Sequence, residues 1–169
     1  MNAQKLKPYF PVLTLLALVV LVGGLDPSFL RPANLLIVAA DVSALFVMAL
    51  GLTFVIYIGG IDLATQSVAS MTTVLVTIWL NSFGIGAAVI ALAIGAAFGV
   101  LSGYVSIKTK IPTFIATLAI GGIAYSVARF ASGERGVSMI ETERSYYLGW
   151  LFGYSGPVPN EIICAGVLL

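Results

Sequence analysis

Gly59-Gly60-Ile61-Asp62-Leu63 lies between two apolar runs and puts two glycines and a carboxylate where a membrane hairpin has to turn. A charged side chain at the centre of a membrane helix costs about 2.5 to 3.5 kcal/mol on insertion scales, and a glycine inside a helix costs about 0.8 to 1 kcal/mol relative to alanine. Non-helical backbone persists only at the membrane surface, inside protein or beside a water-filled path. The stretch therefore predicts a turn between two membrane helices, in which Asp62 is a surface turn residue or part of a pathway.

The composition of the chain indicates a membrane protein without covalent chemistry of its own. The 169 residues are 60% hydrophobic and 9% charged, with a mean hydropathy of +1.08, which is too apolar for a protein that must cover itself with a polar surface. The net charge of +1, on scattered Lys and Arg residues, gives no signal for nucleic acid. Histidine is absent and Cys164 is the only cysteine, so we expect no catalytic residue, no metal site and no cofactor. No Gly-Lys pair is present to form a Walker A loop, so the chain cannot bind and hydrolyse a nucleotide by that route.

Apolar runs divide the chain into helices that cross a bilayer, each of which needs roughly 20 residues. We expect an all-α, polytopic transmembrane helical bundle in a single domain over residues 1–169, with an outer segment over 132–161 and an apparently truncated sixth span over 162–169. Residues 22–26 match a signal-peptide cleavage site poorly, which favours an uncleaved first helix. The five complete spans are expected at about 9–25, 35–58, 63–79, 85–107 and 114–131.

Lysines in the short loops predict the orientation. One pair, Lys5 and Lys7, precedes the first span, and a second, Lys108 and Lys110, separates the fourth from the fifth. The number of crossings between them puts both pairs on one side, which the positive-inside rule assigns to the cytoplasm. We expect a multi-pass protein of the cell (inner) membrane with a cytoplasmic N-terminus. The outer segment is then either an interfacial helix that covers the bundle or a landing surface for a soluble protein, through the aromatic cluster Tyr146, Tyr147, Trp150, Phe152 and Tyr154.

Small residues recur every four positions in the fourth run, and the fifth run has a similar row. Such ridges let membrane helices approach closely, because lipid gives no hydrophobic reward for their association. We expect helix packing through Gly95, Gly99 and Gly103, either within one chain or between two. The two ridges are Ala87, Ala91, Gly95, Gly99 and Gly103 in the fourth run, and Ala116, Ala124 and Ala128 in the fifth.

A longer stretch around the opening glycines carries a family resemblance. Residues 51–63, read as G-L-T-F-V-I-Y-I-G-G-I-D-L and followed by Ser67, resemble the G-M-T-F-V-I-x-x-G-G-I-D-L-S-V-G-S signature of the membrane permeases of ribose-type ABC importers. Residues 28–34 and 111–118 resemble two further segments of that family, in the same order along the chain. The chain departs from the pattern where Ala64, Thr65 and Gln66 replace Ser, Val and Gly, and where Tyr125 takes the place of an arginine, with Arg129 one helical turn later.

The resemblance implies a function that is larger than this chain. It implies a permease that forms the translocation path for a monosaccharide, works by alternating access and pairs with a second permease subunit, an ATP-binding-cassette ATPase and an extracytoplasmic sugar-binding protein. The chain resembles the N-terminal half only, so we expect that it does not transport alone. The alternatives are a truncated or remnant structural membrane subunit, or half of a channel or secondary transporter, which would need intramembrane ionisable groups.

Candidate pathway residues are those that can exchange hydrogen bonds with a sugar. Asp41 lies in the second run, where it is a functional candidate or a hydrated residue near the outer interface. Asp62 either caps the next helix through its backbone N–H groups or belongs to a gate at the inner mouth. The full set proposed for the substrate pathway or its gating is Asp41, Thr53, Tyr57, Gly59, Gly60 and Asp62.

Overall fold

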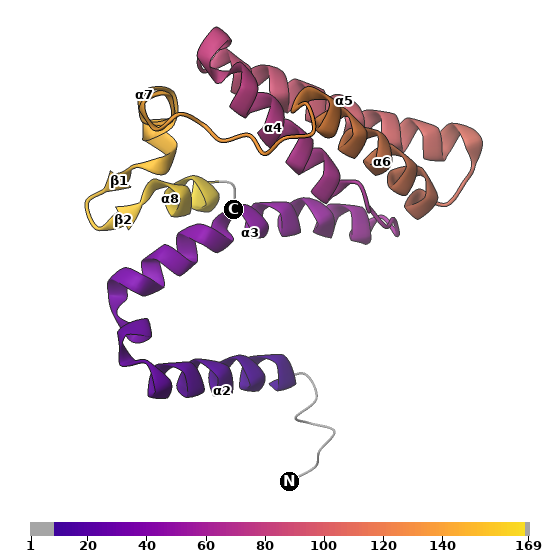
Figure 1. The fold of residues 1–169 in the computed structure, drawn as a ribbon. Helices are drawn as coiled ribbons and strands as arrows, with labels where there is room; N and C mark the ends of the chain where they lie inside the picture. The colour runs from indigo at the N-terminus through magenta and orange to yellow at the C-terminus, as the bar shows by residue number, and fades with distance from the viewer. Residues whose placement is uncertain (1–8, 168–169) are drawn as a thin grey trace, which may run out of the picture.

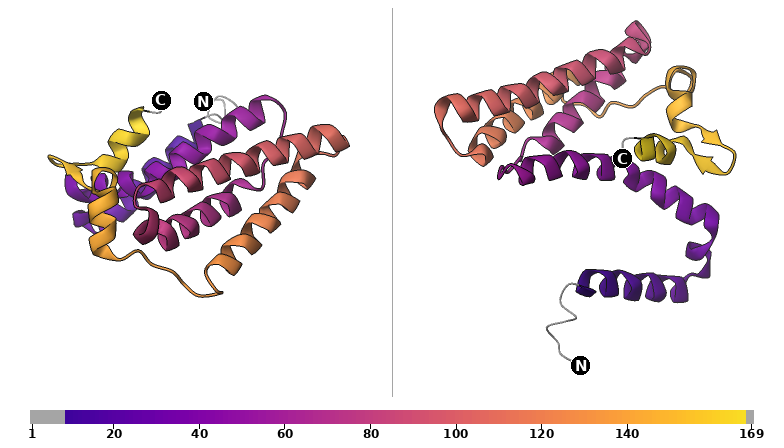
Figure 2. Two further views of the ribbon diagram at one scale, coloured as in Figure 1. Left: turned by 90° about the horizontal axis from the view of Figure 1, so that it is seen from above. Right: turned by 180° about the vertical axis from the view of Figure 1, so that it is seen from behind.

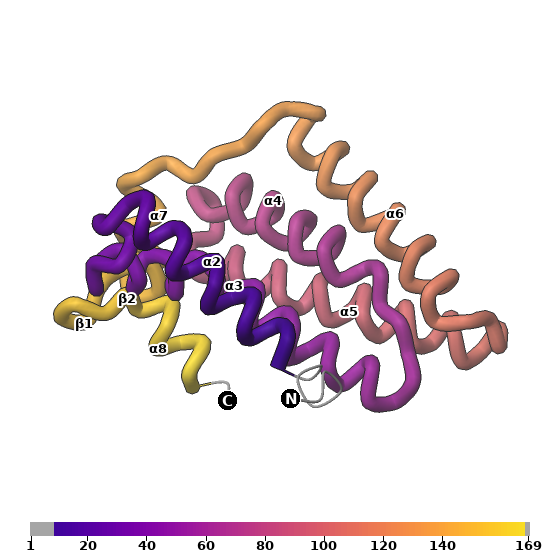
Figure 3. The backbone as a smooth tube through the Cα atoms, turned by 90° about the horizontal axis from the view of Figure 1, so that it is seen from below, coloured from indigo at the N-terminus to yellow at the C-terminus, as the bar shows by residue number. Residues whose placement is uncertain are grey.

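The computed structural model describes residues 9–167 and has a bundle of three helices at its centre (Figure 1). These are α4 (Thr65–Phe83), α5 (Gly86–Thr109) and α6 (Thr113–Ala131), and each packs on the other two. They lie side by side in the views from above and from below (Figures 2 and 3). Large side chains of α4 meet alanines of its neighbours in the core, which contains Met71, Leu75, Ala91, Ala124 and Ala128.

The predicted ridge on α6 is confirmed as a packing surface. Ala116, Ala124 and Ala128 are all buried, and so is Gly121 on the same helix. Because small side chains cover one side of α6, the backbone of α4 and the loop before it come close to this helix. The ridge therefore positions that loop as well as the bundle.

The N-terminal part of the described chain lies apart from the bundle. α2 (Phe10–Leu25) packs on the short 3-10 helix η2 (Pro27–Leu30), and α3 (Pro32–Tyr57) then leads back to α4 (Figure 1). The turn between α2 and η2 is held by Asp26, whose carboxylate accepts a hydrogen bond of 2.9 Å from the Ser28 backbone N–H. Hydrogen bonds from the side chain and the backbone of Ser28 lower the pKa of Asp26 below its usual value.

The C-terminal part contains α7 (Glu141–Phe152), the strands β1 (Tyr154–Ser155) and β2 (Val158–Pro159), and α8 (Asn160–Val167). The strands form an antiparallel hairpin, which is a small correction to the all-α prediction. The Asn160 side chain stabilises this hairpin, because it donates to the Trp150 carbonyl at 2.8 Å and accepts from the Ser155 hydroxyl at 2.7 Å. α7 packs against α4, and α8 packs against α3.

The prediction of five complete spans is not confirmed. Among the described residues, three helices are long and apolar enough to cross a membrane: α3, α5 and α6. α2 has only 16 residues, or about 24 Å of helix against about 30 Å of hydrocarbon. α4 has 19 residues, but it carries several Ser and Thr residues and Gln66. A central helix surrounded by others needs less apolar surface than one in contact with lipid, so hydropathy alone does not identify α4 as a span.

The predicted orientation depends in part on residues that the structure does not describe. Lys5 and Lys7 lie outside the described residues, as do the last two residues of the predicted partial span over 162–169. The cytoplasmic position of the N-terminus therefore stays a prediction.

Candidate functional site

The loop between α3 and α4 begins with a helix terminus that requires glycine. The Gly60 N–H donates to the Val55 carbonyl and the Gly59 N–H donates to the Ile56 carbonyl, both at 2.9 Å. This pair of hydrogen bonds is the Schellman motif, which needs a residue in the left-handed region just after the helix. Gly59 is that residue, with φ +80°. Gly60 is buried, and a Cβ there would lie only 3.0 Å from Cγ1 of Val55. The left-handed backbone therefore favours glycine at position 59, and the lack of space for a side chain favours it at position 60.

Two threonines of α6 hold this loop in place. The Thr113 hydroxyl accepts a hydrogen bond from the Ile61 N–H at 2.9 Å, and the Thr117 hydroxyl accepts one from the Leu63 N–H at 3.0 Å. The hydroxyl of Thr117 also donates to the Ile61 carbonyl at 3.3 Å. The sequence analysis did not single out either threonine. Their spacing of one helical turn was the available signal, since it puts both on one face of α6.

Gly121 continues this face by one more turn and lets the loop lie directly on the helix. A Cβ at Gly121 would lie 3.2 Å from Cα of Ala64 and 3.4 Å from the carbonyl oxygen of Leu63. These are backbone atoms, which cannot move aside as a flexible side chain can. Thr113, Thr117 and Gly121 together form what we call the α6 seat, and the loop over residues 59–64 rests on it.

Asp62 connects the loop to the start of α4. Its carboxylate accepts hydrogen bonds of 2.7 Å from both the Ala64 N–H and the Thr65 hydroxyl. The first bond spans two residues and holds the turn just before the helix. The N-cap residue of α4 is Ala64, which has no side-chain cap hydrogen bond, so Asp62 stabilises the turn and is not itself the N-cap. The second bond comes from one of the residues that depart from the family pattern, because Thr65 stands where that pattern has Val. The departure gives Asp62 an additional hydrogen bond.

The loop over residues 59–64 lies at the same end of the bundle as the turn that carries Lys110. The Ile61 N–H reaches Thr113, the first residue of α6. Lys110 ends α5 in the left-handed conformation, with φ +56°. The sequence analysis put Asp62 and this lysine turn on one side of the membrane, and the hydrogen bond between Ile61 and Thr113 agrees with that placement.

The other candidate pathway residues lie along α3 and are not brought to the loop as a group. Tyr57 is 90% exposed, and the exposed Thr53 donates its hydroxyl to the Ala49 carbonyl at 2.8 Å. Asp41 is also exposed, and it precedes Tyr57 by a helical distance of about 24 Å. Within residues 9–167 its carboxylate forms no hydrogen bond or ion pair with another side chain. The structure therefore separates Asp41 from Asp62.

The predicted packing glycines of α5 differ in what surrounds them. A Cβ at Gly95 would lie 3.1 Å from Cγ2 of Thr72, so this glycine lets α4 and α5 approach. Gly99 and Gly103 are exposed, with no atom of the described chain within 4 Å of an added Cβ. Helix packing at Gly99 and Gly103 stays a prediction, in which the packing partner is a protein segment outside the described chain.

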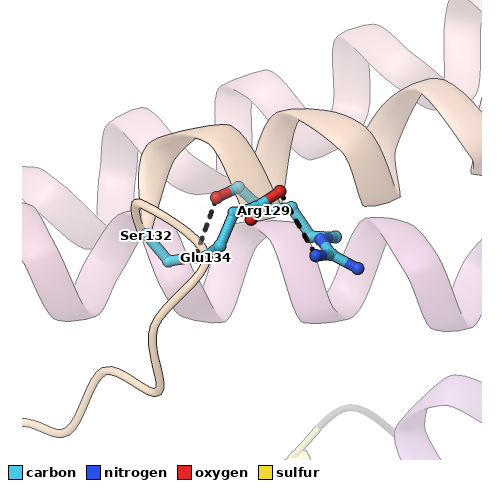
Figure 4. Close-up of polar contacts among 3 residues, drawn as sticks. All are labelled: Arg129, Ser132 and Glu134. Atoms are coloured by element: carbon cyan, nitrogen blue, oxygen red, sulfur yellow. Dashed lines mark hydrogen bonds and ion pairs between the residues drawn. The ribbon is translucent and has the colours of Figure 1, made fainter.

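Arg129, which follows Tyr125 by one turn, is held at the end of α6 (Figure 4). Its guanidinium lies 3.2 Å from the Glu134 carboxylate and 5.9 Å from the centre of the Tyr125 ring. The Ser132 hydroxyl donates to the carbonyl of Arg129 at 3.0 Å. Both partners of the ion pair are more than half exposed, so the pair contributes little to stability.

In the aromatic cluster of α7 and the hairpin, some side chains pack within the chain and others are exposed. Tyr147 packs on Gly84, where an added Cβ would lie 2.8 Å from its ring, and Phe152 lies 4.5 Å below the guanidinium of Arg144. Phe152 is still 36% exposed, and the most exposed rings of the cluster are those of Tyr146, Trp150 and Tyr154.

Within residues 9–167, no group of three or more Cys, Asp or Glu side chains is placed to hold a metal ion. The described polar groups of the site are hydroxyls, backbone N–H groups and one carboxylate. They can exchange hydrogen bonds with a solute.

Comparison with known proteins gives a family match and several relatives. A family model described as "Branched-chain amino acid transport system / permease component" matches residues 34–162. The ribose import permease protein RbsC of Escherichia coli (strain K12) is 32% identical over 163 residues, which cover 93% of this chain and 50% of the relative. RbsC of Bacillus subtilis (strain 168) is 40% identical over 120 residues, 69% of this chain and 36% of the relative. The inner membrane ABC transporter permease protein YjfF of E. coli K12 is 36% identical over 109 residues, 60% of this chain and 33% of the relative. The chain spans half or less of the length of these relatives, and no solved structure matches it.

Proposed function

Because the chain belongs to the permease-component family of branched-chain amino acid transport systems, we propose that it forms part of the translocation path of an ATP-binding-cassette importer for a monosaccharide. The observation that carries the proposal is the similarity to the E. coli ribose import permease over 93% of this chain. The proposed partners are an ATPase subunit, a second permease subunit in a homo- or heterodimer, an extracytoplasmic sugar-binding protein and membrane lipid. The permease itself makes and breaks no covalent bond.

The loop over residues 59–64 is well placed to act in gating. It forms hydrogen bonds to α6 through Ile61 and Leu63, and to the start of α4 through Asp62. A change in the angle between α3 and α6 would therefore move the start of α4 with it. Alternating access requires this kind of coupling between helices around a path. We assign Gly59, Gly60 and Asp62 to this gate.

Exposed polar groups on α3 form the second part of the proposed path. Asp41, Thr53 and Tyr57 are exposed on a helix that is long and apolar enough to cross a membrane. An exposed carboxylate in such a helix is costly in lipid, which favours a position against other protein or water. In the assembled importer we expect these three side chains to contact the path or neighbouring protein.

The exposed aromatic residues of the outer segment suit the proposed binding protein. Tyr146, Trp150 and Tyr154 present large rings with polar edges, which are common in protein interfaces. The remainder of the cluster packs within the chain. These three rings are the most exposed of the cluster, so they are the residues that a docking partner would cover.

Reconstitution in proteoliposomes tests the proposed function. The chain is assembled with the second permease subunit and the ATPase subunit, and uptake of radiolabelled D-ribose, D-xylose, L-arabinose and D-galactose is measured with and without ATP and the binding protein. We expect uptake of at least one sugar only when both are present. Uptake that follows the sugar gradient without ATP would instead identify a channel or secondary transporter.

Substitutions at Asp62 distinguish a positioning role from a role of its charge. We expect Asp62→Asn to transport at close to the unmodified rate, because an amide oxygen can still accept from the Ala64 N–H. Asp62→Ala loses both hydrogen bonds and should lower the free energy of unfolding by about 0.5 to 2 kcal/mol. Uptake and thermal unfolding in detergent are measured on both variants. Loss of uptake in Asp62→Asn with unchanged unfolding would show that the negative charge itself operates the gate.

A further inference from the structure

A groove between α4 and α5 contains polar groups that the gate does not use. It has a volume of about 450 Å³ between the first half of α4 and the middle of α5, and it begins beside Asp62. Its volume lies within the range of about 300 to 1,000 Å³ that is usual for small-molecule sites. The polar residues that line it are Asp62, Thr65, Thr72 and Ser102.

Ser102 is the residue that makes this groove more than a gap between helices. It is only 8% exposed, and among the described residues its hydroxyl has no hydrogen-bond partner. Several helical hydroxyls of the chain donate to the carbonyl one turn earlier, as Thr109 does on the same helix, at 2.7 Å to Val105. An unsatisfied buried hydroxyl is costly, so a partner from outside the described chain is expected in the groove.

Lipid does not provide that partner. Hydrocarbon offers neither donors nor acceptors, and a carboxylate that faces it is disfavoured. Because the carboxylate of Asp62 and the hydroxyl of Ser102 line one groove, the groove has to hold water, a polar solute or another protein segment.

The hydrogen-bonding groups of the groove limit the kinds of solute that can bind there. Thr65 donates to Asp62, and Thr72 donates to the Ala69 carbonyl at 2.9 Å, so both hydroxyls retain lone pairs that accept. Ser102 can donate and accept. The occupant must therefore bring several donors and at least one acceptor, and the carboxylate of Asp62 disfavours an anion. A neutral polyhydroxylated molecule meets all of these requirements.

We propose that the α4–α5 groove is a binding subsite for a neutral polyhydroxylated solute, with Ser102 as its buried hydrogen-bond partner. This proposal rests on the proposed function. It adds one binding site to the path that the sugar would take through the permease. Gly99 also lines the groove, and an added Cβ there would meet no atom of another segment of the described chain within 4 Å, so a sugar ring can approach α5 at this position.

Cysteine labelling in the assembled importer tests the subsite independently of transport. Ser102→Cys is made in a Cys164→Ser background, which removes the only native cysteine. The chain, the second permease subunit, the ATPase and the binding protein are assembled in proteoliposomes and treated with a small thiol reagent. The four sugars named above serve as probes, each at high concentration. Ser82→Cys is the matched control, because Ser82 is exposed at the end of α4 and does not line the groove.

We expect at least one sugar to slow labelling of Ser102→Cys severalfold and to leave Ser82→Cys unchanged. Equal labelling with and without every sugar would overturn the proposal. So would a Ser102→Cys variant that is never labelled, because another protein segment would then fill the groove. The proposed function is judged separately, by ATP-dependent uptake through the unmodified chain, so its failure is distinguishable from the failure of the subsite.

A hydrogen-bond variant gives a second readout. Ser102→Ala should lower the rate of sugar uptake about fivefold, as expected for the loss of one net hydrogen bond of about 1 kcal/mol. Ser102→Thr keeps the hydroxyl and should restore most of the rate. Equal uptake by Ser102→Ala and the unmodified chain would count against the subsite.

Discussion

Replacement of Gly121 by valine should lower the free energy of unfolding by about 1 to 3 kcal/mol more than the same replacement at Gly122, which follows it on α6. A side chain at Gly121 meets the Ala64 Cα and the Leu63 carbonyl oxygen, at 3.2 and 3.4 Å from an added Cβ. Because these are backbone atoms, the loop has to lift from the α6 seat. An added Cβ at Gly122 has no atom within 4 Å.

The pair of glycines forms a matched comparison. Both lie in the middle of one helix, so the change in helix propensity is about the same for the two substitutions. Thermal unfolding of the purified chain in detergent, followed by circular dichroism, gives the difference between the two variants. Equal stability of Gly121→Val and Gly122→Val would contradict the close contact between the loop and α6.

Thr117→Val should also have a large effect, although valine has nearly the same shape as threonine. The substitution removes the acceptor for the Leu63 N–H and the donor for the Ile61 carbonyl. Thr117 is only 6% exposed, so water does not readily replace the lost bonds. A buried backbone group without a partner costs about 1 to 3 kcal/mol, and the free energy of unfolding should fall by an amount in that range.

Hydrogen exchange locates this effect as well as measuring it. In Thr117→Val the Leu63 amide should exchange faster than in the unmodified chain, because its hydrogen bond is lost. Thr117→Ser keeps the hydroxyl and is the control, with protection at Leu63 close to that of the unmodified chain. If Thr117→Val retained full protection there, the α6 seat would not be what holds the loop.

The positions of the helices could be read from the sequence to within a few residues. The predicted runs over 35–58, 85–107 and 114–131 became α3, α5 and α6, because continuous apolar stretches of that length have few alternatives to a membrane helix. The number of complete spans was less predictable. Hydropathy describes contact with lipid, and α4 contacts other helices over much of its surface, with Met71 and Leu75 buried between them.

The candidate site was predicted only in part. The glycines of the loop and the interaction of Asp62 with the next helix follow from local rules, since they involve atoms within a few residues of each other. The role of Thr117 does not, because it depends on hydrogen bonds to residues more than 50 positions earlier in the chain. The groove at Ser102 was missed for the same reason, since α4 and α5 each contribute part of its lining.

The sequence by itself determined that this is a helical membrane protein of an ABC permease family, with a turn at Gly59 and Gly60. These features are local. The length of an apolar run predicts a membrane helix, because backbone in lipid has to form its hydrogen bonds within the helix, and a helix terminus in the left-handed region favours glycine. Only the tertiary structure decided that the loop rests on Thr113, Thr117 and Gly121, and that Ser102 lies in a groove between α4 and α5. Those facts depend on how helices distant in the sequence pack together, and many packings are compatible with one pattern of small residues.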